Sequence, residues 1–309
     1  MPQQRDPITD WAGPFSGQAV ARAAQAACML EVCAPKPGNV NRLHDFADTR
    51  FEDFLLSAIA IGPAMAEADR VGVGQTIWQA IRDTRQLVQS NTNLGIVLLL
   101  APLAKACLAA GDLRENLRHV LSALTVEDAR RAYAAIRLAQ PGGLRQTSQA
   151  DVSEEPSITL CQAMALAQER DSIACEYITD FAITFEIGYP ALREAWRVAD
   201  NPSNAIVQCY LTLLARVPDT LIARKRGVET ATQVLHWAAE TLALGGALTP
   251  QGHRALADLD RTLRDERHTL NPGTTADLTT AALFLFLLCD MYTSPSERCV
   301  LSMCAPDRR

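Results

Sequence analysis

Apolar residues recur at helical spacing through most of this 309-residue chain, and no segment alternates between apolar and polar residues as a half-buried strand does. Residues 51–65 and 73–88 each repeat apolar side chains at steps of three and four. Residues 94–108 are apolar on nearly all sides, which predicts a helix at the centre of the protein. The pattern therefore predicts an all-α protein, with roughly ten helices in one domain and a polar pocket lined by the loops between them.

Capping and breaking residues predict the ends of several helices. Thr125 and Asp128 form a capping-box pattern that predicts a helix to about Ala139, ended by Pro141-Gly142-Gly143. Thr249-Pro250 is typical of a helix start. Further helices are predicted at residues 157–168, 171–187, 203–216, 228–244, 250–268 and 275–291. We expect a single domain over residues 1–309, with a core at 16–291, a loop at 144–155 and a weakly structured tail at 294–309.

Charge and composition exclude several classes of function. The formal net charge is −6, and no basic stripe with interleaved aromatic residues is present, so we expect no nucleic-acid binding. The nine cysteines are scattered without a Cys-x-x-Cys pair, as is typical of a reducing compartment. The longest apolar run, 94–104, is about half the length that spans a bilayer, and the first residues lack a signal-peptide profile. We expect a cytoplasmic protein without a membrane partner, and the alanine- and leucine-rich composition is compatible with a homodimer.

Four polar clusters interrupt the apolar pattern, and the first is the turn Pro35-Lys36-Pro37-Gly38. The prolines fix their own φ and the glycine permits φ values that other residues resist, so we expect a stiff loop after a helix that ends near Glu31. Asn39, His44 and Asp48 follow on the same segment. Lys36 is one of only three lysines in a chain rich in arginine. A lysine at this position indicates that a compact point charge is needed there. Asp48 suits either a Mg²⁺ site or a helix start, where an acid stabilises the dipole.

The other three clusters also combine polar groups with helix ends. Asn91-Thr92-Asn93 precedes the most apolar helix, where backbone N–H groups form an anion site or one side chain serves as an N-cap. Asp219-Thr220 is followed by Arg224-Lys225-Arg226, a set that could grip phosphate oxygens and hold a metal, or form a charged surface turn. Asp277 follows the turn Asn271-Pro272-Gly273 by one helical turn, a position where the helix dipole also favours an acid.

Taken together, these clusters resemble the triphosphoribosyl-dephospho-CoA synthase family, in particular its divergent branch from methylotrophs and archaea. The resemblance runs from about Val20 to Leu288. Each matching piece is short, and their number and order carry the resemblance. The pieces are Glu31 with Lys36-Pro37-Gly38, His44 and Asp48 before residues 54–58, Asn91-Thr92-Asn93-Leu94-Gly95, Gly188-Tyr189-Pro190, Asp219-Thr220 with residues 224–227, and Pro272-Gly273 with Ala276-Asp277-Leu278.

The resemblance implies an all-α enzyme with two small-molecule substrates, ATP and dephospho-CoA or a related acceptor. The triphosphoribosyl group of ATP would pass to the ribose 2′-hydroxyl of 3′-dephospho-CoA, and adenine would leave. Mg²⁺ is implied as the cofactor that bridges triphosphate oxygens. Metal or electrostatic roles are implied for Glu31, Asp48, Asp219 and Asp277.

The remaining implied roles concern proton transfer and phosphate binding. His44 or Glu31 is the expected base, and Asp219 completes the expected catalytic set. Lys36, Arg224 and Lys225 are expected to neutralise phosphates. The other expected nucleotide-binding residues are Gly38, Asn39, Asn91, Thr92, Asn93 and Thr220.

Two cationic motifs of the better-known family members are missing from this chain. Those members carry His-Lys after Asn-Thr, where this chain has Asn93-Leu94. They also carry Gly-Ala-Arg-Gly-Glu before the Gly-Tyr-Pro motif, where residues 182–188 keep only the acid Glu186 approximately. Two alternatives therefore stay open. One is a nucleotide-dependent transferase acting on another acceptor in one-carbon cofactor biosynthesis, and the other is an inactive helical scaffold that binds nucleotide.

Overall fold

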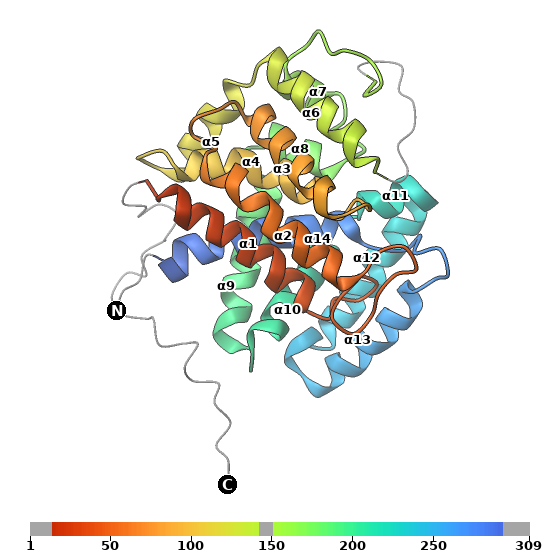
Figure 1. Cartoon of the computed structure of the whole chain (residues 1–309). Coiled ribbons are helices and arrows are strands. Elements are labelled where there is room, and N and C mark those ends of the chain that lie inside the picture. The colour runs from red at the N-terminus through yellow and green to blue at the C-terminus, as the bar shows by residue number, and fades with distance from the viewer. Residues whose placement is uncertain (1–13, 142–150, 293–309) are drawn as a thin grey trace.

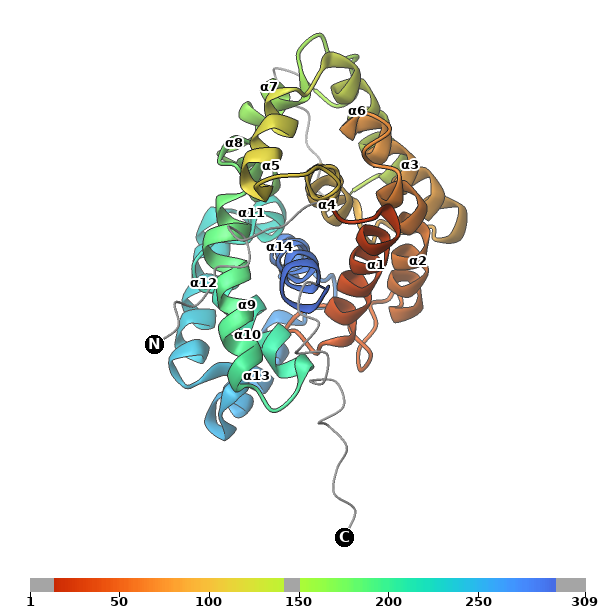
Figure 2. The same cartoon turned by 90° about the vertical axis from the view of Figure 1, so that its left-hand side faces the viewer.

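The computed structural model describes residues 14–141 and 151–292, and two apolar helices form its centre. Helix α4 (Leu94–Cys107) buries every residue except Gly95 and Lys105. Helix α14 (Gly273–Phe286) has three partly exposed residues, all among its first five. Figure 2 shows α14 in the middle of the molecule. It contacts α4, the helix at residues 17–33 near the N-terminus, and the two helices at residues 189–214. Because α4 is apolar on nearly every side, it packs against neighbours all round, as its sequence predicts.

Residues 17–178 supply one group of helices around this centre (Figure 1). In this group α1 packs on α2, and α3 packs against α2 and α6. Both α1 and α2 also contact the central pair, α1 through α14 and α2 through α4, which fixes their positions relative to it. The helices of this group are α1 (Gly17–Cys33), α2 (Phe51–Ala66), α3 (Val73–Leu87), α5 (Leu113–Ser122), α6 (Val126–Ala139), α7 (Leu160–Ala165) and α8 (Ser172–Ile178).

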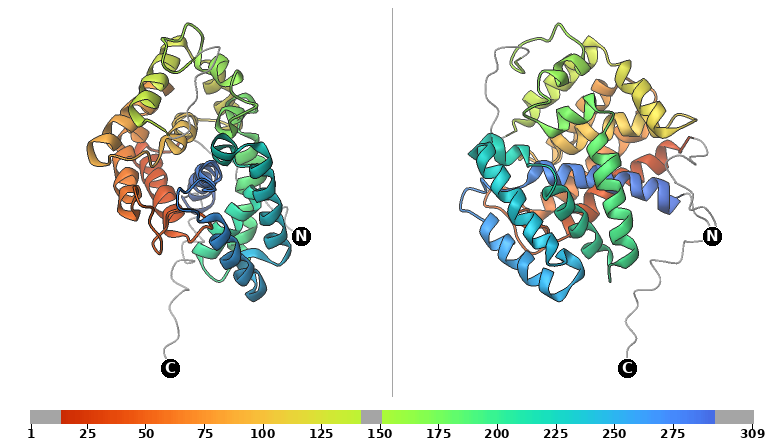
Figure 3. Two further views of the ribbon diagram at one scale, coloured as in Figure 1. Left: turned by 90° about the vertical axis from the view of Figure 1, so that its right-hand side faces the viewer. Right: turned by 180° about the vertical axis from the view of Figure 1, so that it is seen from behind.

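The second half of the chain covers the opposite side, where Figure 3 shows α12 and α13 side by side. Its helices are α9 (Tyr189–Val198), α10 (Pro202–Leu214), α11 (Thr220–Arg226), α12 (Val228–Ala243) and α13 (Pro250–Leu263). Short π or 3₁₀ turns lie at Thr184–Gly188, Gly246–Leu248 and Leu287–Tyr292. Residues 14–141 and 151–292 contain no β-strand, only an isolated bridge between Asn41 and His44. The predicted all-α fold is confirmed.

Several predicted helix ends are confirmed by hydrogen bonds. The Thr125 hydroxyl accepts the Asp128 N–H at 3.1 Å, and the Asp128 carboxylate accepts the Thr125 N–H at 2.9 Å, which completes the capping box of α6. The Thr249 hydroxyl caps α13 by accepting the N–H of Gly252 at 3.0 Å. Within the predicted loop, residues 151–155 form turns and bends. The rest of that loop, the Gly142-Gly143 breaker and the predicted tail lie outside the described residues.

The continuous helix predicted at 171–187 is wrong. Helix α8 stops early because Asp180 and Phe181 adopt φ values of 53° and 60°, in the left-handed region. The buried Glu176 carboxylate compensates for the lost helical bonds. It accepts the backbone N–H groups of residues 183 and 184 at 2.9 and 2.7 Å. The apolar spacing correctly indicated a buried face, but spacing carries no information on a left-handed break.

Other differences concern helix length. Helix α13 is shorter than the predicted 250–268, because Arg264 leaves the helical conformation with φ −92° and ψ 90°. The helix predicted at 157–168 is only six residues long. Helices α5, α9 and α11 were not predicted, since at seven to ten residues each offers few turns in which an apolar repeat can be recognised.

One described helical stretch, Gly273–Met291, is long and apolar enough to cross a membrane on length and composition alone. It includes the central helix α14, and 78% of its apolar window is buried inside the protein. Its apolar character is therefore accounted for by its position in the core.

Candidate functional site

The loop after α1, residues 34–41, is called the Lys36 loop, and every residue in it except Pro35 is buried. Lys36 points into the protein, where its Nζ forms an ion pair with Glu31 Oε1 at 3.0 Å. The same ammonium donates to the carbonyl oxygens of Glu31 and Ala34, so its three protons all have acceptors. Burial raises the pKa of Glu31, and the Lys36 charge opposes that rise. Lys36 thus compensates Glu31 at the end of α1, and its phosphate-binding role stays a prediction.

Asp219 joins α11 to α14 and is buried. Its Oδ1 accepts two N–H groups from the first turn of α11, at 2.9 and 3.0 Å. Its Oδ2 accepts the N–H and the hydroxyl of Thr275, both at 2.8 Å. Beside it, the Thr220 hydroxyl donates to the Thr274 hydroxyl at 3.2 Å. Burial raises the pKa of Asp219 and these bonds oppose the rise. Both oxygens are used in holding two helices together, and the catalytic and metal roles of Asp219 stay predictions.

Asp277 lies in the second turn of α14 and differs from the other acids nearby in having free oxygens. It is partly exposed, and among the described residues its carboxylate makes no hydrogen bond or ion pair. The carboxylate lies against the first turn of α4. A Cβ added to Gly95 would come within 2.0 Å of Asp277 Oδ2 and 2.7 Å of Ile173 Cδ1. The close approach of Asp277 therefore requires glycine at position 95.

Glu31, Asp171, Asp219 and Asp277 form a set that we call the acidic junction. Burial raises the pKa of Asp277 well above its ordinary value, and the charges of Glu31, Asp219 and Asp171 raise it further. Arg224 opposes this rise and forms an ion pair with Asp171 at 2.9 Å. Three acids of the junction have partners, whereas Asp277 has none among residues 14–141 and 151–292. A carboxylate held in this state is typical of a functional site.

Arg224 and Lys225 present positive charge beside the acidic junction, at the end of α11. Arg224 uses one terminal nitrogen on Asp171, while its buried Nε has no hydrogen-bond partner within the described part of the chain. Lys225 Nζ donates to the carbonyl oxygen of His268 at 3.1 Å. Burial lowers the pKa of Lys225, and the charge of Asp219 opposes that fall. A lysine with one carbonyl acceptor has two further protons for phosphate oxygens.

His44 and Asp48 lie on the exposed loop between α1 and α2. This loop is attached to the second half of the chain by Phe46, whose ring stacks on His268 with the centroids 3.8 Å apart. The Asp48 charge raises the pKa of Lys225, against the larger effect of burial. His44 and Asp48 are both exposed, and their roles as base and metal ligand stay predictions.

Asn91, Thr92 and Asn93 each take part in starting α4. Asn91 Oδ1 accepts the N–H of the first residue of α4 at 3.2 Å. Thr92 shares a hydrogen bond of 2.5 Å with the hydroxyl of Ser57, and Asn93 Nδ2 donates to the hydroxyl of Thr84 at 3.0 Å. These bonds fix α4 to α2 and α3. The nucleotide-binding role of the three residues stays a prediction.

The motif Gly188-Tyr189-Pro190 lies near the opposite end of α14 from Asp277. The Tyr189 hydroxyl donates to Asp290 Oδ2 at 2.7 Å, and Arg193 pairs with the same carboxylate at 3.0 Å. A Cβ at Gly188 would lie 3.1 Å from the Cβ of Ala282 on α14. The structure thus gives this motif a packing role on α14.

The carboxylates of this region can be compared with the ligands that Mg²⁺ needs. Among the described residues, no group of three or more histidine, cysteine, aspartate or glutamate side chains is arranged to hold a metal. Mg²⁺, however, needs only one or two protein carboxylates when phosphate oxygens and water fill its other positions. The exposed Asp48 and the free carboxylate of Asp277 fit this requirement.

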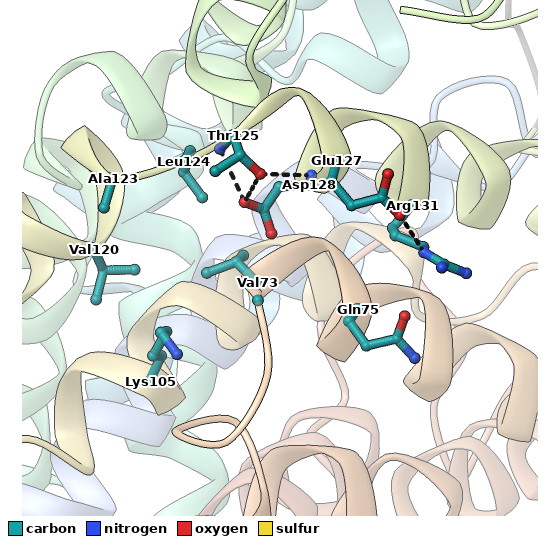
Figure 4. Close-up of a pocket in the computed structure, with 11 residues that line it drawn as sticks. Val73, Gln75, Lys105, Val120, Ala123, Leu124, Thr125, Glu127, Asp128 and Arg131 are labelled. Atoms are coloured by element: carbon teal, nitrogen blue, oxygen red, sulfur yellow. Dashed lines mark hydrogen bonds and ion pairs between the residues drawn. The ribbon is translucent and has the colours of Figure 1, made fainter.

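A cavity of about 360 Å³ lies between α3, α4 and the segment joining α5 to α6 (Figure 4). Lys105 borders it, ten residues from Gly95 and thus about 15 Å away along α4. Its Nζ donates to three carbonyl oxygens after α2, at 2.8 to 3.2 Å, and Glu127 pairs with Arg131 at 2.8 Å. Since these charged groups already have partners, the cavity is not assigned to a substrate.

Comparison with known proteins decides the family. The model of the ATP:dephospho-CoA triphosphoribosyl transferase family matches residues 17–295, which is most of the chain. This chain belongs to that family. Its class is therefore that of an enzyme, a transferase with ATP and dephospho-CoA as substrates.

Two bacterial relatives agree with this assignment. The chain is 25% identical over 304 residues to a protein of Stutzerimonas stutzeri strain A1501, covering 91% of this chain and 96% of the relative. It is also 25% identical over 272 residues to a protein of Pseudomonas savastanoi pv. phaseolicola, covering 82% and 84%. Both are named as probable 2-(5''-triphosphoribosyl)-3'-dephosphocoenzyme-A synthases.

A solved structure supports the fold and the class. The crystal structure of a candidate triphosphoribosyl-dephospho-CoA synthase from Archaeoglobus fulgidus aligns with a TM-score of 0.59 and 30% identity. The alignment covers 75% of this chain and 97% of that one. The predicted family and all-α architecture are therefore confirmed.

Four residues around the family's motifs were missed by sequence reasoning, namely Asp171, Tyr210, Asp260 and Arg264. Asp171 carries a local signal, because an aspartate before an apolar segment is typical of an N-cap, and its Oδ1 indeed accepts the N–H of Ile173 at 2.9 Å. The other three stand on helical patterns without any motif. Their contacts with the Lys36 loop are made with residues more than 170 positions away, so no local signal could have shown that they hold this loop.

Proposed function

We propose that this chain transfers the triphosphoribosyl group of ATP to 3′-dephospho-CoA at the acidic junction. One observation supports placing the reaction at the acidic junction. Asp277 is partly exposed and unpaired among the described residues, while Glu31, Asp171 and Asp219 are each held by a cation or by backbone and hydroxyl donors. A substrate group that enters the junction therefore meets one available carboxylate.

The reaction breaks the bond between C1′ of the ATP ribose and adenine, and forms a bond from C1′ to the 2′-hydroxyl oxygen of dephospho-CoA. The hydroxyl loses a proton and the departing adenine gains one. Positive charge develops at C1′, where the Asp277 carboxylate would stabilise it and accept the hydroxyl proton. In its ionised form, Asp277 is a stronger base than an ordinary aspartate, because its pKa is raised.

The triphosphate would lie towards the end of α11. Arg224 and Lys225 supply positive charge there, and Lys225 has protons not used by the His268 carbonyl. Lys36 would act indirectly, by compensating the charge of Glu31. Mg²⁺ would accompany the triphosphate, with Asp48 as its protein ligand on the exposed side. When bound, the ion would neutralise charge on the phosphate oxygens.

The test compares Asp277→Asn with Asp258→Asn, which removes an exposed carboxylate on α13. Each protein is incubated with ATP, Mg²⁺ and dephospho-CoA, and released adenine is measured. General-base catalysis contributes about 100-fold or more, so we expect Asp277→Asn to lose at least about 100-fold in kcat and Asp258→Asn to match the wild type. A wild-type rate in Asp277→Asn would show that the reaction takes place elsewhere.

A second candidate function is the same donor chemistry with another acceptor, as in one-carbon cofactor biosynthesis. The observation that favours it is the missing cation pair. Where better-known members carry His-Lys, this chain has a buried Leu94 and an Asn93 whose amide is bonded to Thr84. ATP consumption with another acceptor, and none with dephospho-CoA, would support this candidate. Nucleotide binding without turnover of any acceptor would instead indicate an inactive scaffold.

A further inference from the structure

The backbone of the buried Lys36 loop is held by side chains from the second half of the chain. The Tyr210 hydroxyl, on α10, donates to the carbonyl oxygen of Pro37 at 2.8 Å and accepts the Asn39 amide at 2.8 Å. The N–H of Gly38 donates to Asp260 Oδ1, on α13, at 2.8 Å. A buried loop needs such partners, because its backbone polar groups would otherwise lose their hydrogen bonds to water.

Arg264 contacts both Asp260 and the Lys36 loop. Its Nε donates to Asp260 Oδ2 at 2.8 Å, and a terminal nitrogen donates to the Asn39 carbonyl oxygen at 2.9 Å. These two side chains are 19% and 23% exposed, whereas the neighbouring pair Arg261–Asp258 on α13 is 75% and 68% exposed. The Arg264–Asp260 pair is therefore a shielded, directional contact, and the Arg261–Asp258 pair is an ordinary surface pair.

The Lys36 loop also touches the start of α14. Gly38 has φ +75°, and an added Cβ would lie 2.8 Å from the Cβ of Leu263 and 3.0 Å from Cδ of Pro272. Asn271 Nδ2 donates to Asn39 Oδ1 at 3.1 Å. Pro272 immediately precedes α14, which carries Asp277. The loop thus connects the end of α1, with Glu31, to the beginning of α14.

We infer that Asp260 and Arg264 are positioning residues, which hold the Lys36 loop so that the end of α1, with Glu31, and the start of α14, which leads to Asp277, keep their places at the acidic junction. They act through the backbone of Gly38 and Asn39, and they contact no reacting group. The inference rests on the proposed function, since it assigns their purpose to the acidic junction.

Three variants remove parts of this contact. Arg264→Gln and Asp260→Ala each break both the ion pair and a bond to the loop, while Asp260→Asn keeps an oxygen for the Gly38 N–H. We expect the first two to lower kcat for adenine release by about 10-fold or more with KM for ATP changed less than about threefold, because a misplaced catalytic group affects the transition state more than binding. Asp260→Asn should recover part of the loss, and Arg261→Gln should match the wild type.

Amide hydrogen exchange over residues 34–41 gives a second measurement that does not need turnover. Faster exchange in Arg264→Gln with lower kcat supports the inference. Wild-type kcat in Arg264→Gln overturns the inference while leaving the proposed function intact, whether KM stays unchanged or rises. If the wild type releases no adenine, the proposed function fails instead, and unchanged exchange in Arg264→Gln would then overturn the positioning as well. Should Arg264→Gln not fold, the comparison of Asp260→Asn with the wild type decides by the same criteria.

Discussion

Replacing Gly95 with alanine would displace Asp277 without altering any charged group. The new Cβ would lie 2.0 Å from Asp277 Oδ2 and 2.6 Å from its Cγ, whereas ordinary contacts begin at 3.4 Å. The carboxylate must therefore move by about 1.4 Å. A displacement of about 1 Å in a reacting group can cost on the order of 100-fold in rate, which corresponds to about 2.7 kcal/mol in the activation barrier.

The same substitution should change stability much less than activity. Alanine in a helix is favoured over glycine by about 1 kcal/mol. Extra volume in a packed site costs about 1–3 kcal/mol, here mainly through Asp277 and Ile173. The two effects oppose each other, so we expect the free energy of unfolding to fall by no more than about 2 kcal/mol.

The assay is adenine release at saturating ATP and dephospho-CoA, together with urea unfolding of each protein. Gly62→Ala is the matched control, since Gly62 also lies inside a helix. The three atoms nearest to its added Cβ all belong to the amide end of the flexible Gln25 side chain, the first at 2.4 Å. We expect Gly62→Ala to keep wild-type kcat. A folded Gly95→Ala with more than half of wild-type kcat would refute the placement of the reaction at Asp277.

Three further predictions concern the buried charges. Lys36→Met should lower the free energy of unfolding by about 3–5 kcal/mol in urea titrations, because Glu31 would stay buried without its ammonium partner, and the double variant with Glu31→Gln should lose less. Asp219→Asn should cost about 1–3 kcal/mol and lower the thermal midpoint, because an amide group would face N–H donors that now have a carboxylate oxygen. Burial raises the pKa of Glu176 from 4.5 to about 7, so the folded state binds this proton more tightly than the unfolded state does. The stabilisation is complete below pH 4.5 and is lost as pH rises to about 7, by up to about 3 kcal/mol, and Glu176→Gln should remove this part of the pH dependence of unfolding.

Much of the fold could be predicted from local sequence patterns. The all-apolar stretch 94–108 predicted a central helix, and the Thr125 and Thr249 signals predicted the starts of α6 and α13, because each depends on residues within one or two turns. The break after Ile178 could not be predicted in this way. It depends on whether the chain folds back so that the Glu176 carboxylate meets two N–H groups beyond the break, seven and eight residues further on, which is decided by the surrounding packing.

The residues of the candidate site could be predicted from the sequence, but the contacts between them could not. The sequence indicated that Lys36, Asp219 and Asp277 belong to special segments. It could not show that Lys36 faces inward to Glu31, that Asp219 has no free oxygen, or that Asp277 has no partner among the described residues. A side chain's direction and its acceptors depend on tertiary contacts, such as the one between Asp219 and Thr275, 56 residues apart.

The position of α14 has a consequence for how the protein is made. Its residues leave the ribosome after α1, α4, α9 and α10, yet all four pack against it. Until α14 arrives, the inner faces of those helices have no partner, and the growing chain exposes apolar surface that favours aggregation. Synthesis of the first 270 residues should therefore give a chain that depends on chaperones. The residues that complete the core are also those that bring Asp277 to Gly95, so the core and the acidic junction form in the same step.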